Sequence, residues 1–489
     1  MSRPGSNRSY LRHSPSYTGP QKKKGRCGET LKCLKTEKKC VNSVTLVRAA
    51  PLFPSIAPTQ RLDVYVFGRN DYGQLGLGDS VTQIEYPKLN PKLAAGTVGV
   101  VHLAVGGAHA AALTYDNQIL TWGDNSDRAL GRGTTEDGSD DDDEEEEKEE
   151  NDCDGNGETV WNMREAVPLP VDLIAFPAGT VFTHLAATES ATFVLTSTGL
   201  VYGWGTFRTF RMAPTTIHIP GLTKVVKIVA GAQHMLALTS EGKVFSWGSN
   251  EQRQLGRRRL RHNPPHHLAP AQCGLPSGIV DLSAGHYHSF AIHRNGDVYA
   301  WGLNNYMQTV ILSGIDQYGG ATVEFPTKVP SLARLPNIIT IQGGKDHSHA
   351  IDQGRQCYSW GRIDNMGIGV NPRALLDPDV IFRMINSQRI PEILKVPVVA
   401  SPGLLGVECV GVGIDHSIVI TNTGEGYSWG INAQHQTGHP GAGDDIVNPR
   451  LLRSNDIDGQ TLVFASCGRQ FSIVAGVYTS VANNSRRDN

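Results

Sequence analysis

Five histidines recur at one place in a repeated pattern, and histidine is the side chain best suited to acid–base chemistry or metal binding near neutral pH. Each stands thirteen residues before a tryptophan: His109, His234, His288, His347 and His416 precede Trp122, Trp247, Trp301, Trp360 and Trp429. A side chain that is needed in every copy of a repeat cannot be one ligand in one site. We therefore interpret the motif histidines, and the tryptophans with them, as packing residues.

No other group of residues with catalytic chemistry separates itself from this background. The sequence has no Ser/His/Asp or paired-carboxylate arrangement outside the repeat, so a hydrolase or lyase is the disfavoured alternative. The eight cysteines show no CxxC pair and no Cys/His ligand spacing, and we interpret them as reduced thiols of an intracellular protein. No apolar run of ~18 residues could span a membrane. We expect no covalent chemistry, no cofactor and no metal ion.

Two short motifs alternate from about residue 63 to 478. One is an aromatic residue followed by glycine, and the other is a turn of small residues that leads into an apolar strand. The first motif occurs at Phe67-Gly68, Trp122-Gly123, Trp204-Gly205, Trp247-Gly248, Trp301-Gly302, Trp360-Gly361 and Trp429-Gly430. The second is clear at Gly106-Gly107, Gly231, Gly285, Gly343-Gly344 and Gly413, and weaker at 187–191 and 467–471. Between them lie two apolar strands separated by a hairpin signal such as Asn295-Gly296.

This organisation predicts an all-β fold, a seven-bladed β-propeller. A unit of ~50 residues with a hairpin and further strands matches a four-stranded blade, and a ring of blades protects the strand edges. The chain opens with an aromatic-glycine motif at residue 67 and closes with an unpaired glycine turn at 468. We therefore expect Asp63–Gly68 and Phe464–Val477 to complete one blade, so that pairing of N- and C-terminal strands closes the ring.

Charge is strongly segregated although the formal net charge is only −2. Residues 1–50 carry twelve Lys/Arg and two Glu, whereas 136–154 carries fourteen acids and one Lys. We expect a basic tail without fixed structure over 1–60, a propeller over 61–478 with an acidic insertion at 136–154, and a second unstructured tail over 479–489. The acidic insertion is either a solvated loop or a polyanion mimic that attracts histones or a basic GTPase surface.

The basic tail has two readings. Its Lys/Arg favour binding to nucleic acid phosphates, with nuclear import as a compatible role. A start rich in Arg and Ser and poor in acids leaves a mitochondrial transit peptide as the alternative. The candidates for chromatin binding or import are Lys22, Lys23, Lys24 and Arg26.

The repeats resemble those of the regulator of chromosome condensation family, the exchange factor for the small GTPase Ran, over about residues 63–478. The resemblance includes Asn70-Asp71-Tyr72-Gly73-Gln74-Leu75-Gly76, with echoes at 254–256 and 436–438. The acidic insertion is similar to that of fungal members. The resemblance implies a monomeric nuclear exchange factor that acts on Ran at chromatin, in nucleocytoplasmic transport and mitosis, with a nucleosome or DNA as a further partner.

Residues that break the repeat are the better candidates for binding a partner. Directly before the motif histidine stand Gln233, Asp346 and Asp415, on the turn end of a blade. Glu189 and Asp71 match family positions that contact Ran, and Phe207 and Arg208, with 209–211, match the start of a β-wedge that the family presses against the GTPase. The acids either contact a basic partner or are solvated loop residues with local turn bonds.

Two departures from the family pattern stand out. From the aromatic residue to the next motif position, intact units run 41 to 56 residues, the longest from Trp360 to His416, but Trp204 to His234 is only 30. About eleven residues are thus missing where the family places its wedge. Gln233 also replaces a family aspartate. The gene model has lost a segment, or exchange is poor, or the partner differs. The alternative function is a propeller scaffold that binds another GTPase or a non-GTPase protein without exchange.

Overall fold

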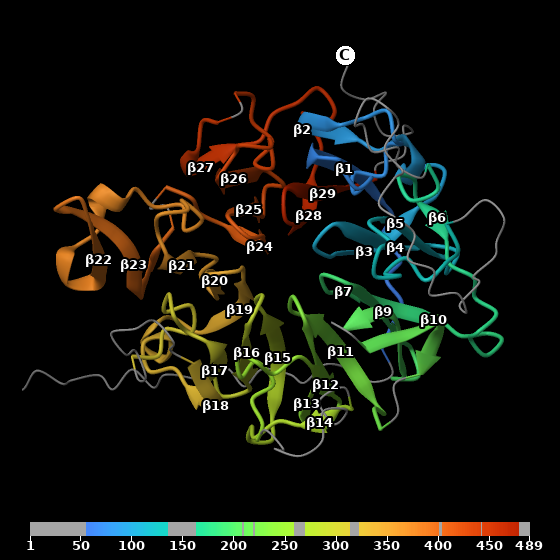
Figure 1. The fold of residues 1–489 in the computed structure, drawn as a ribbon, viewed down its shortest axis with the longest axis horizontal. Helices are drawn as coiled ribbons and strands as arrows, with labels where there is room; N and C mark the ends of the chain where they lie inside the picture. Colours follow the sequence, from blue (N-terminus) through green and yellow to red (C-terminus); the bar gives the residue numbers. More distant parts are fainter. Residues whose placement is uncertain are drawn as a thin grey trace, which may run out of the picture. The chain divides into compact units, whose positions relative to one another are not determined.

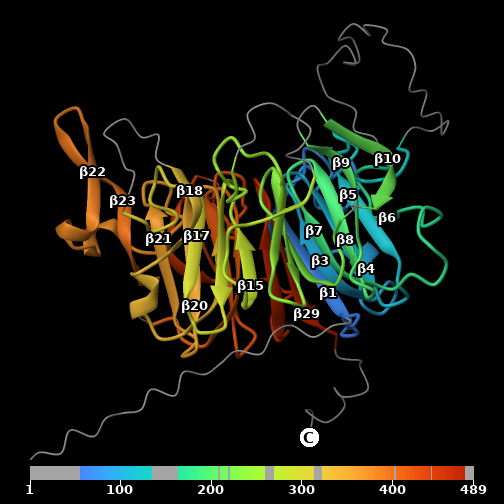
Figure 2. The same ribbon diagram turned by 90° about the horizontal axis from the view of Figure 1, so that it is seen from below.

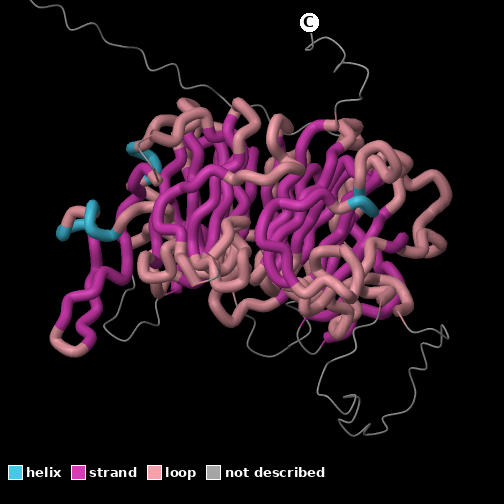
Figure 3. The backbone as a smooth tube through the Cα atoms, turned by 90° about the horizontal axis from the view of Figure 1, so that it is seen from above, coloured by secondary structure: helices cyan, strands magenta, loops and turns pink. Residues whose placement is uncertain are grey.

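The computed structural model describes residues 55–134, 163–207, 210–218, 221–258, 269–312, 322–400, 403–441 and 443–478. The chain divides into two compact units, Met1–Val44 and Thr45–Asn489, and every described residue belongs to the second. These residues are strands joined by turns, with short 3-10 helices at Pro91–Leu93, Leu332–Arg334, Pro372–Ala374 and Asp377–Asp379. The strands form sheets arranged around a central axis (Figure 1 and Figure 3). The fold is an all-β propeller, which confirms the predicted class.

Several sequence predictions lie outside the described residues. They concern the acidic insertion 136–154, the tail 479–489 and nearly all of the basic tail. Of the named site candidates, Lys22, Lys23, Lys24, Arg26 and Arg208 also lie outside.

Each repeat unit contributes strands that lie side by side, from an innermost strand near the centre of the ring to an outermost strand at its edge (Figure 1). The first unit has β3 (Val100–Val105), β4 (His109–Thr114), β5 (Ile119–Gly123) and β6 (Leu169–Pro170). The second has β7 (Phe182–Ala187), β8 (Ala191–Thr196), β9 (Val201–Phe207) and β10 (Phe210–His218). The third has β11 (Val225–Ala230), β12 (His234–Thr239), β13 (Val244–Gly248) and β14 (Ala271–Gln272).

The remaining units follow the same order. The fourth has β15 (Ile279–Ala284), β16 (His288–His293), β17 (Val298–Leu303) and β18 (Thr322–Lys328). The fifth has β19 (Ile338–Gly343), β20 (His347–Asp352), β21 (Cys357–Arg362), β22 (Val380–Ile385) and β23 (Gln388–Val399). The sixth has β24 (Val407–Val412), β25 (His416–Thr421), β26 (Gly426–Gly430) and β27 (Ile446–Leu451). The closing unit combines β28 (Leu462–Cys467) and β29 (Phe471–Val477) with β1 (Leu62–Arg69) and β2 (Gln83–Leu89).

Hydrogen bonding divides the described strands into six sheets, not the seven separate sheets that the sequence predicts. Five sheets have four or five strands, and the sixth has eight. The eight-stranded sheet contains the closing unit and the first unit, which a single residue pair, Leu62 with Val100, joins. Two neighbouring repeat units therefore merge where the first residue of β1 reaches β3.

The ring is closed by the strands that the sequence predicts to close it. β1 pairs antiparallel with β29 along its length, from Leu62 opposite Val477 to Gly68 opposite Phe471. β29 in turn pairs with β28. Segments some 400 residues apart thus share one sheet, and each end of the propeller holds the other in place.

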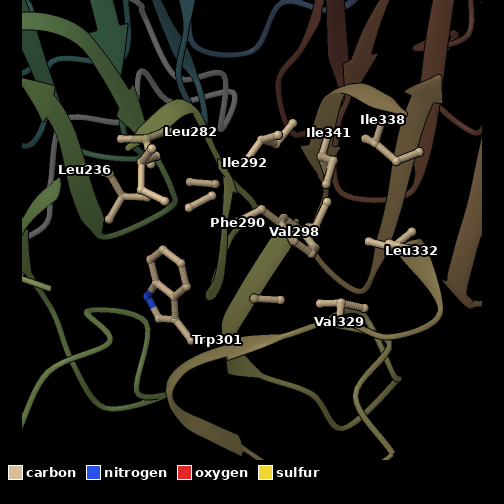
Figure 4. Packing of buried hydrophobic residues seen from close by; sticks show 14 of the residues in the cluster. Leu236, Leu282, Phe290, Ile292, Val298, Trp301, Val329, Leu332, Ile338 and Ile341 are labelled. Atoms are coloured by element: carbon tan, nitrogen blue, oxygen red, sulfur yellow. The ribbon is translucent and has the colours of Figure 1, made fainter. Parts of the chain in front are cut away.

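The core consists of apolar clusters that lie between neighbouring sheets. The second strand of several units is buried along its whole length, as in β4, β8 and β12, because both faces of each sheet are covered. In one cluster Leu236, Phe290, Trp301 and Ile338 bring together the third, fourth and fifth units (Figure 4). All six motif tryptophans are fully buried, which confirms their assignment as packing residues.

The motif histidines bond each unit to the next one. Nε2 of His109, His234, His288, His347 and His416 lies 3.0, 2.8, 2.9, 3.1 and 2.8 Å from the hydroxyl oxygen of Thr192, Ser289, Ser348, Ser417 and Ser472. Each hydroxyl donates its own proton to a loop carbonyl of the preceding unit, as Ser289 does to Gln254 at 3.1 Å. Nε2 must therefore carry the ring proton and donate it. This confirms a structural role for these histidines.

The same loop carbonyl usually accepts a second bond, from the tryptophan indole. Trp301 Nε1 donates to the Gln254 carbonyl at 2.8 Å, and Trp360 to that of Gln308 at 2.8 Å. The contact recurs at Trp122, Trp204 and Trp429. Histidine, hydroxyl and tryptophan thus act together at the junctions of Trp204, Trp301, Trp360 and Trp429.

Two junctions lack the histidine, and both lack its hydroxyl partner too. Ala191 and Phe471 occupy the histidine position, and the residues that would supply the hydroxyl are Met235 and Ala110. Apolar packing replaces the polar pair, which avoids leaving one buried polar group alone.

Trp247 is the exception among the tryptophans. It is 1 % exposed, and its Nε1 has no hydrogen-bond partner among the described residues. The loop that would supply the carbonyl follows Trp204, in the segment that is about eleven residues short. The shortened loop therefore has a structural consequence at the next tryptophan.

Replacing tryptophan by phenylalanine should distinguish these two environments. We expect Trp301→Phe to lower the free energy of unfolding by about 1 kcal/mol more than Trp247→Phe, because only Trp301 loses a hydrogen bond. Urea unfolding followed by circular dichroism measures both. An equal loss would mean that the Trp247 indole has a partner after all.

Candidate protein-binding face

One end of the ring carries both repeated motifs. Antiparallel pairing sets each motif histidine opposite the glycine of the Trp-Gly motif in its own unit, as His288 opposite Gly302 and His416 opposite Gly430. The glycine turns and the connections after the Trp-Gly strands therefore lie at the same end of every unit. We call this end the loop face. Hairpin turns such as Asn295-Gly296 lie at the other end.

Backbone hydrogen bonds link the glycine turns around the centre of the loop face. The amides of Glu189, Ala232, His286, Lys345 and Arg469 donate to the carbonyls of Ala232, His286, Gly344, Gly413 and Gly107 at 2.9, 3.0, 2.9, 3.3 and 3.0 Å. Glycine is required where turns meet this closely. A Cβ on Gly285 would lie 2.2 Å from His288 Cε1 and 2.7 Å from the Gly344 oxygen. The centre of the face is thus rigid.

A narrow cavity of about 270 Å³ lies inside this circle of turns. Glu189 contributes its charge there, and its Oε1 lies 3.3 Å from Arg469 Nη2 and 3.8 Å from His286 Nδ1. Burial, and then the charges of Lys345 and Arg469, lower the pKa of His286 to about 4, so the imidazole is neutral. Glu189 and Arg469 therefore form an ion pair that connects the second unit to the closing unit.

Asp346 is almost completely buried, at 5 % exposure, rather than presented on an open rim. Its Oδ2 accepts from Arg362 Nη1 at 3.3 Å, and burial raises its pKa although Arg362 opposes the shift. Arg362 also bonds Asp364 and lies 4.9 Å from the centre of the Tyr306 ring. Asp346 is consequently held in place with its charge compensated.

Asp71 and Asp415 are half-buried and also have partners in the chain. Both carboxylate oxygens of Asp71 lie 2.6 Å from Arg69 Nε, and Arg69 reaches Gln434 of the sixth unit at 3.1 Å. Asp415 accepts from Asn365 Nδ2 at 3.0 Å. Its charge also contributes to the raised pKa of Asp346, so these two acids lie near each other. In the absence of a partner protein, these two acids thus form hydrogen bonds within the chain.

Gln233 lies in the glycine turn of the third unit, where its main-chain carbonyl accepts from the Ser249 amide at 2.7 Å. Its side chain is half-buried. The residue holds the turn against the Trp-Gly end of β13.

The predicted wedge remnant forms a short hairpin. Phe207 at the end of β9 pairs with Phe210 at the start of β10, and Gly205 pairs with Met212. Only Thr206 and Phe207 extend β9 beyond its Trp-Gly motif. The Thr206 hydroxyl donates to the Asp127 carbonyl at 2.9 Å, which ties the hairpin base to the first unit. We call the described strand ends of this hairpin, residues 206–207 and 210–211, the lip.

Sequence reasoning missed the cationic partners of the predicted acids, Arg69, Arg362 and Arg469, and also His286. Arg469 could have been noticed because it stands in the weak last glycine turn. It also missed a long hairpin in the fifth unit, β22–β23, although the 56-residue spacing from Trp360 to His416 was its signal.

The described residues contain no group of three or more His, Cys, Asp or Glu side chains that could hold a metal ion. No helix within the described ranges is long and apolar enough to cross a membrane.

A rigid ring of sheets whose polar face is built from compensated charges around a narrow centre is the architecture of a propeller that binds other macromolecules on its surface. The chain belongs to the family of the RCC1-like domain, and the model of that family matches residues 63–474.

Relatives with known names cover most of the chain. Protein pim1 of Schizosaccharomyces pombe is 36% identical over 86% of this chain and 75% of its own length. The guanine nucleotide exchange factor SRM1 of Saccharomyces cerevisiae is 29% identical over 88% of this chain and 90% of its own. The crystal structure of Prp20p from Saccharomyces cerevisiae, described with its binding to Gsp1p and histones, aligns with a TM-score of 0.75 at 27% identity, covering 88% of this chain and 94% of that one.

Proposed function

We propose that this protein is a guanine-nucleotide exchange factor for the small GTPase Ran. The observation that carries the proposal is its membership of the RCC1-like family together with a relative, SRM1, that is named as an exchange factor and aligns over 88% of this chain. The loop face supports it, since its acids and their cations form a polar surface around a narrow cavity of only about 270 Å³. If the experiment below shows no exchange activity, the alternative is a scaffold that binds a partner without exchange.

Such a factor makes and breaks no covalent bond. It accelerates nucleotide release because it binds the nucleotide-free GTPase more tightly than the loaded form, and the coupling is reciprocal. It does not determine whether GDP is replaced by GTP or the reverse. That direction follows from the cell's excess of GTP.

On the loop face we assign GTPase contacts to Asp71, Glu189, Gln233 and Asp415, to the lip with Phe207, and to Arg208. Asp346, which is only 5 % exposed, would act through its neighbours Arg362 and Asp415 rather than by direct contact. The cations that hold the acids in the free protein fix their orientation and leave a binding surface that needs little reordering. A basic partner can share these carboxylates because Glu189 and Asp71 remain partly exposed. Gln233 supplies hydrogen bonds without charge.

We also propose that the propeller has seven blades. The closing unit and the first unit count as separate blades, because one residue pair joins them while each has its own four strands. The proposed boundaries are a basic tail over 1–60, the propeller over 61–478 with its insertion at 136–154, and a tail over 479–489.

The protein would act in the nucleus at chromatin, as a monomer, with a nucleosome or DNA bound through Lys22, Lys23, Lys24 and Arg26. Prp20p, whose structure was determined together with its binding to histones, supports this location. A chain that lacks residues 1–50 should lose its chromatin association and nuclear enrichment. Loss of a mitochondrial signal instead would establish the alternative address.

The decisive experiment measures release of a fluorescent guanine nucleotide from purified Ran with catalytic amounts of this protein. We expect acceleration over the intrinsic rate. Glu189→Ala and Asp415→Ala should each lower kcat/KM about tenfold, which is about 1.4 kcal/mol. Their melting temperatures should change little, because each loses only a partly exposed contact.

Asp297→Ala is the matched control, because Asp297 likewise has a partner in the chain, Lys328 Nζ at 2.8 Å, but stands in a hairpin turn at the end opposite the loop face. Exchange should be unaffected by it. Absence of acceleration by the wild-type protein would overturn the proposed function. If Glu189→Ala instead unfolds the protein, its role is the ion pair with Arg469.

A further inference from the structure

The hairpin β22–β23 of the fifth unit extends away from the ring, and we call residues 380–394 the arm. Figures 1, 2 and 3 all show it projecting beyond the other sheets. Ile393 and Leu394 pair with Arg362 and Gly361 at the end of β21, so the residues from Gln388 to Glu392 continue past that end. At ~3.3 Å per residue the arm rises about 17 Å beyond the strand. Because β21 ends at the loop face, the arm stands on that face.

Local contacts brace the arm. The Arg389 guanidinium lies 3.8 Å from the centre of the Phe382 ring and 3.0 Å from Asp377, while Arg383 lies 3.2 Å from Glu392 across the hairpin. The arm is rooted in a cluster of its own, formed by Ile363, Ile368, Val380 and Leu394. Exposed ion pairs add little stability, but together with the stacked ring they define one conformation. The arm is therefore preorganised.

The end of the arm exposes apolar side chains. Met384 is 63% exposed and Ile385 37%. The turn at Asn386 and Ser387 has φ of 49° and 65°, as a two-residue hairpin requires. Met384 and Ile385 are neighbours at the tip of this projecting hairpin, where a partner on the loop face could cover both. The charged groups of the arm already have partners, Arg383 in Glu392 and Arg389 in Asp377, so the tip suits an apolar patch on a partner.

The position of the arm indicates which partner this is. The lip of the second unit also rises on the loop face, on the opposite side of the ring (Figures 1 and 2). The lip passes its Trp-Gly motif by two residues and is the shortened counterpart of the expected wedge. A protein bound to the loop face would therefore contact a short projection at the second unit and the longer arm at the fifth unit.

We propose that the arm is a second contact for the GTPase. Met384 and Ile385 bind the side of the GTPase while the centre of the loop face binds it from below. This rests on the proposed exchange function. The arm supplies the binding energy that the shortened lip does not. Because the contact lies at the perimeter, it strengthens binding of the loaded and nucleotide-free forms alike, which is uniform binding.

The test uses the full chain with Met384→Ser and Ile385→Ser combined. Both side chains are exposed, so the melting temperature should be unchanged. We expect KM for nucleotide-loaded Ran to rise about tenfold, or about 1.4 kcal/mol, with kcat within twofold, because uniform binding affects KM alone. The control is Leu405→Ser with Ile174→Ser, which removes two exposed apolar side chains, 66% and 88% exposed, from connections at the opposite end of the ring.

The outcomes separate the two proposals. If the wild-type protein does not accelerate release, the exchange function fails. If the wild-type protein is active and the arm variant has the same KM, the arm proposal is overturned, and so it is if kcat falls while KM is unchanged. Met384→Lys, which keeps the hairpin register and changes one exposed side chain, should raise KM in the same direction. An unchanged KM with weakened histone binding would assign the arm to another partner.

Discussion

The protein is expected to unfold cooperatively when the pH falls below about 5.5, because its buried histidines cannot be protonated without loss of the fold. Burial lowers the pKa of five of them to about 3 and of three more to about 4, and lowers that of His347 well below its usual value. The first group is His102, His234, His288, His349 and His416, and the second is His109, His286 and His439.

The direction of this pH dependence follows from the different pKa values of these histidines in the folded and unfolded chain. The unfolded chain takes up protons on these residues near pH 6.5. In the folded chain eight of them do so only near pH 3 to 4, and the pKa of His347 is also well below its usual value, so the stabilisation is complete above pH 6.5 and is lost as the pH falls below it. Each histidine contributes about 1.4 kcal/mol per pH unit. Nine such groups exceed the typical stability of a domain, about 5–15 kcal/mol, within a pH unit or two. Melting temperatures between pH 8 and 4.5 measure the effect.

A variant that copies a natural junction provides the control. His288→Phe with Ser348→Ala reproduces the pairing of Phe471 with Ala110, where the chain itself lacks both polar groups. Its free energy of unfolding should depend less on pH below 6, by about 1.4 kcal/mol per unit, since one fewer histidine titrates. A melting temperature that stays constant down to pH 4.5 would show that the buried imidazoles do not control stability.

Removal of the closing strands should abolish folding. A chain that ends at Thr461 lacks β28 and β29, which provide the partner strand of β1 and the buried side chains Phe471, Ile473 and Val474. Fully burying such a side chain contributes about 1.5–3 kcal/mol, and Leu462 and Ala465 are lost as well. The total is comparable to the stability of a whole domain. We expect no cooperative thermal transition and strong binding of a hydrophobic dye.

A chain that ends at Tyr478 is the matched control. It keeps every described strand and should melt within a few degrees of the full protein. A cooperative transition at the wild-type temperature in the shorter chain would mean that the ring is stable without closure by its two ends.

Much of the fold could be predicted because its determinants are local and repeated. A hairpin signal, an aromatic-glycine pair and a glycine turn occupy the same places in unit after unit, and each specifies structure within about twenty residues of itself. The closure of the ring also followed from the order of the motifs, since β1 and β29 complete a unit that neither end contains alone. The structural role of the histidines followed from their repetition.

The candidate site was harder to predict from the sequence, because its charged residues come from different units. Glu189 meets Arg469 across some 280 residues of sequence, and no spacing rule connects them. Arg362 is near Asp346 in sequence, but nothing in the pattern predicted that burial of Asp346 would raise its pKa. The arm was visible only as a long interval, which does not distinguish a braced hairpin from a loop.

The sequence by itself determined the class of fold, the repeating unit and the pairing of the two ends, because β-strand period and turn chemistry act over short distances. Tertiary structure alone decided which acids have their charge compensated, which motif tryptophan finds no hydrogen-bond partner among the described residues, that Leu62 merges two units into one sheet, and that an arm stands on the loop face. These features depend on how neighbouring sheets approach one another, and that distance is set by packing around the whole ring.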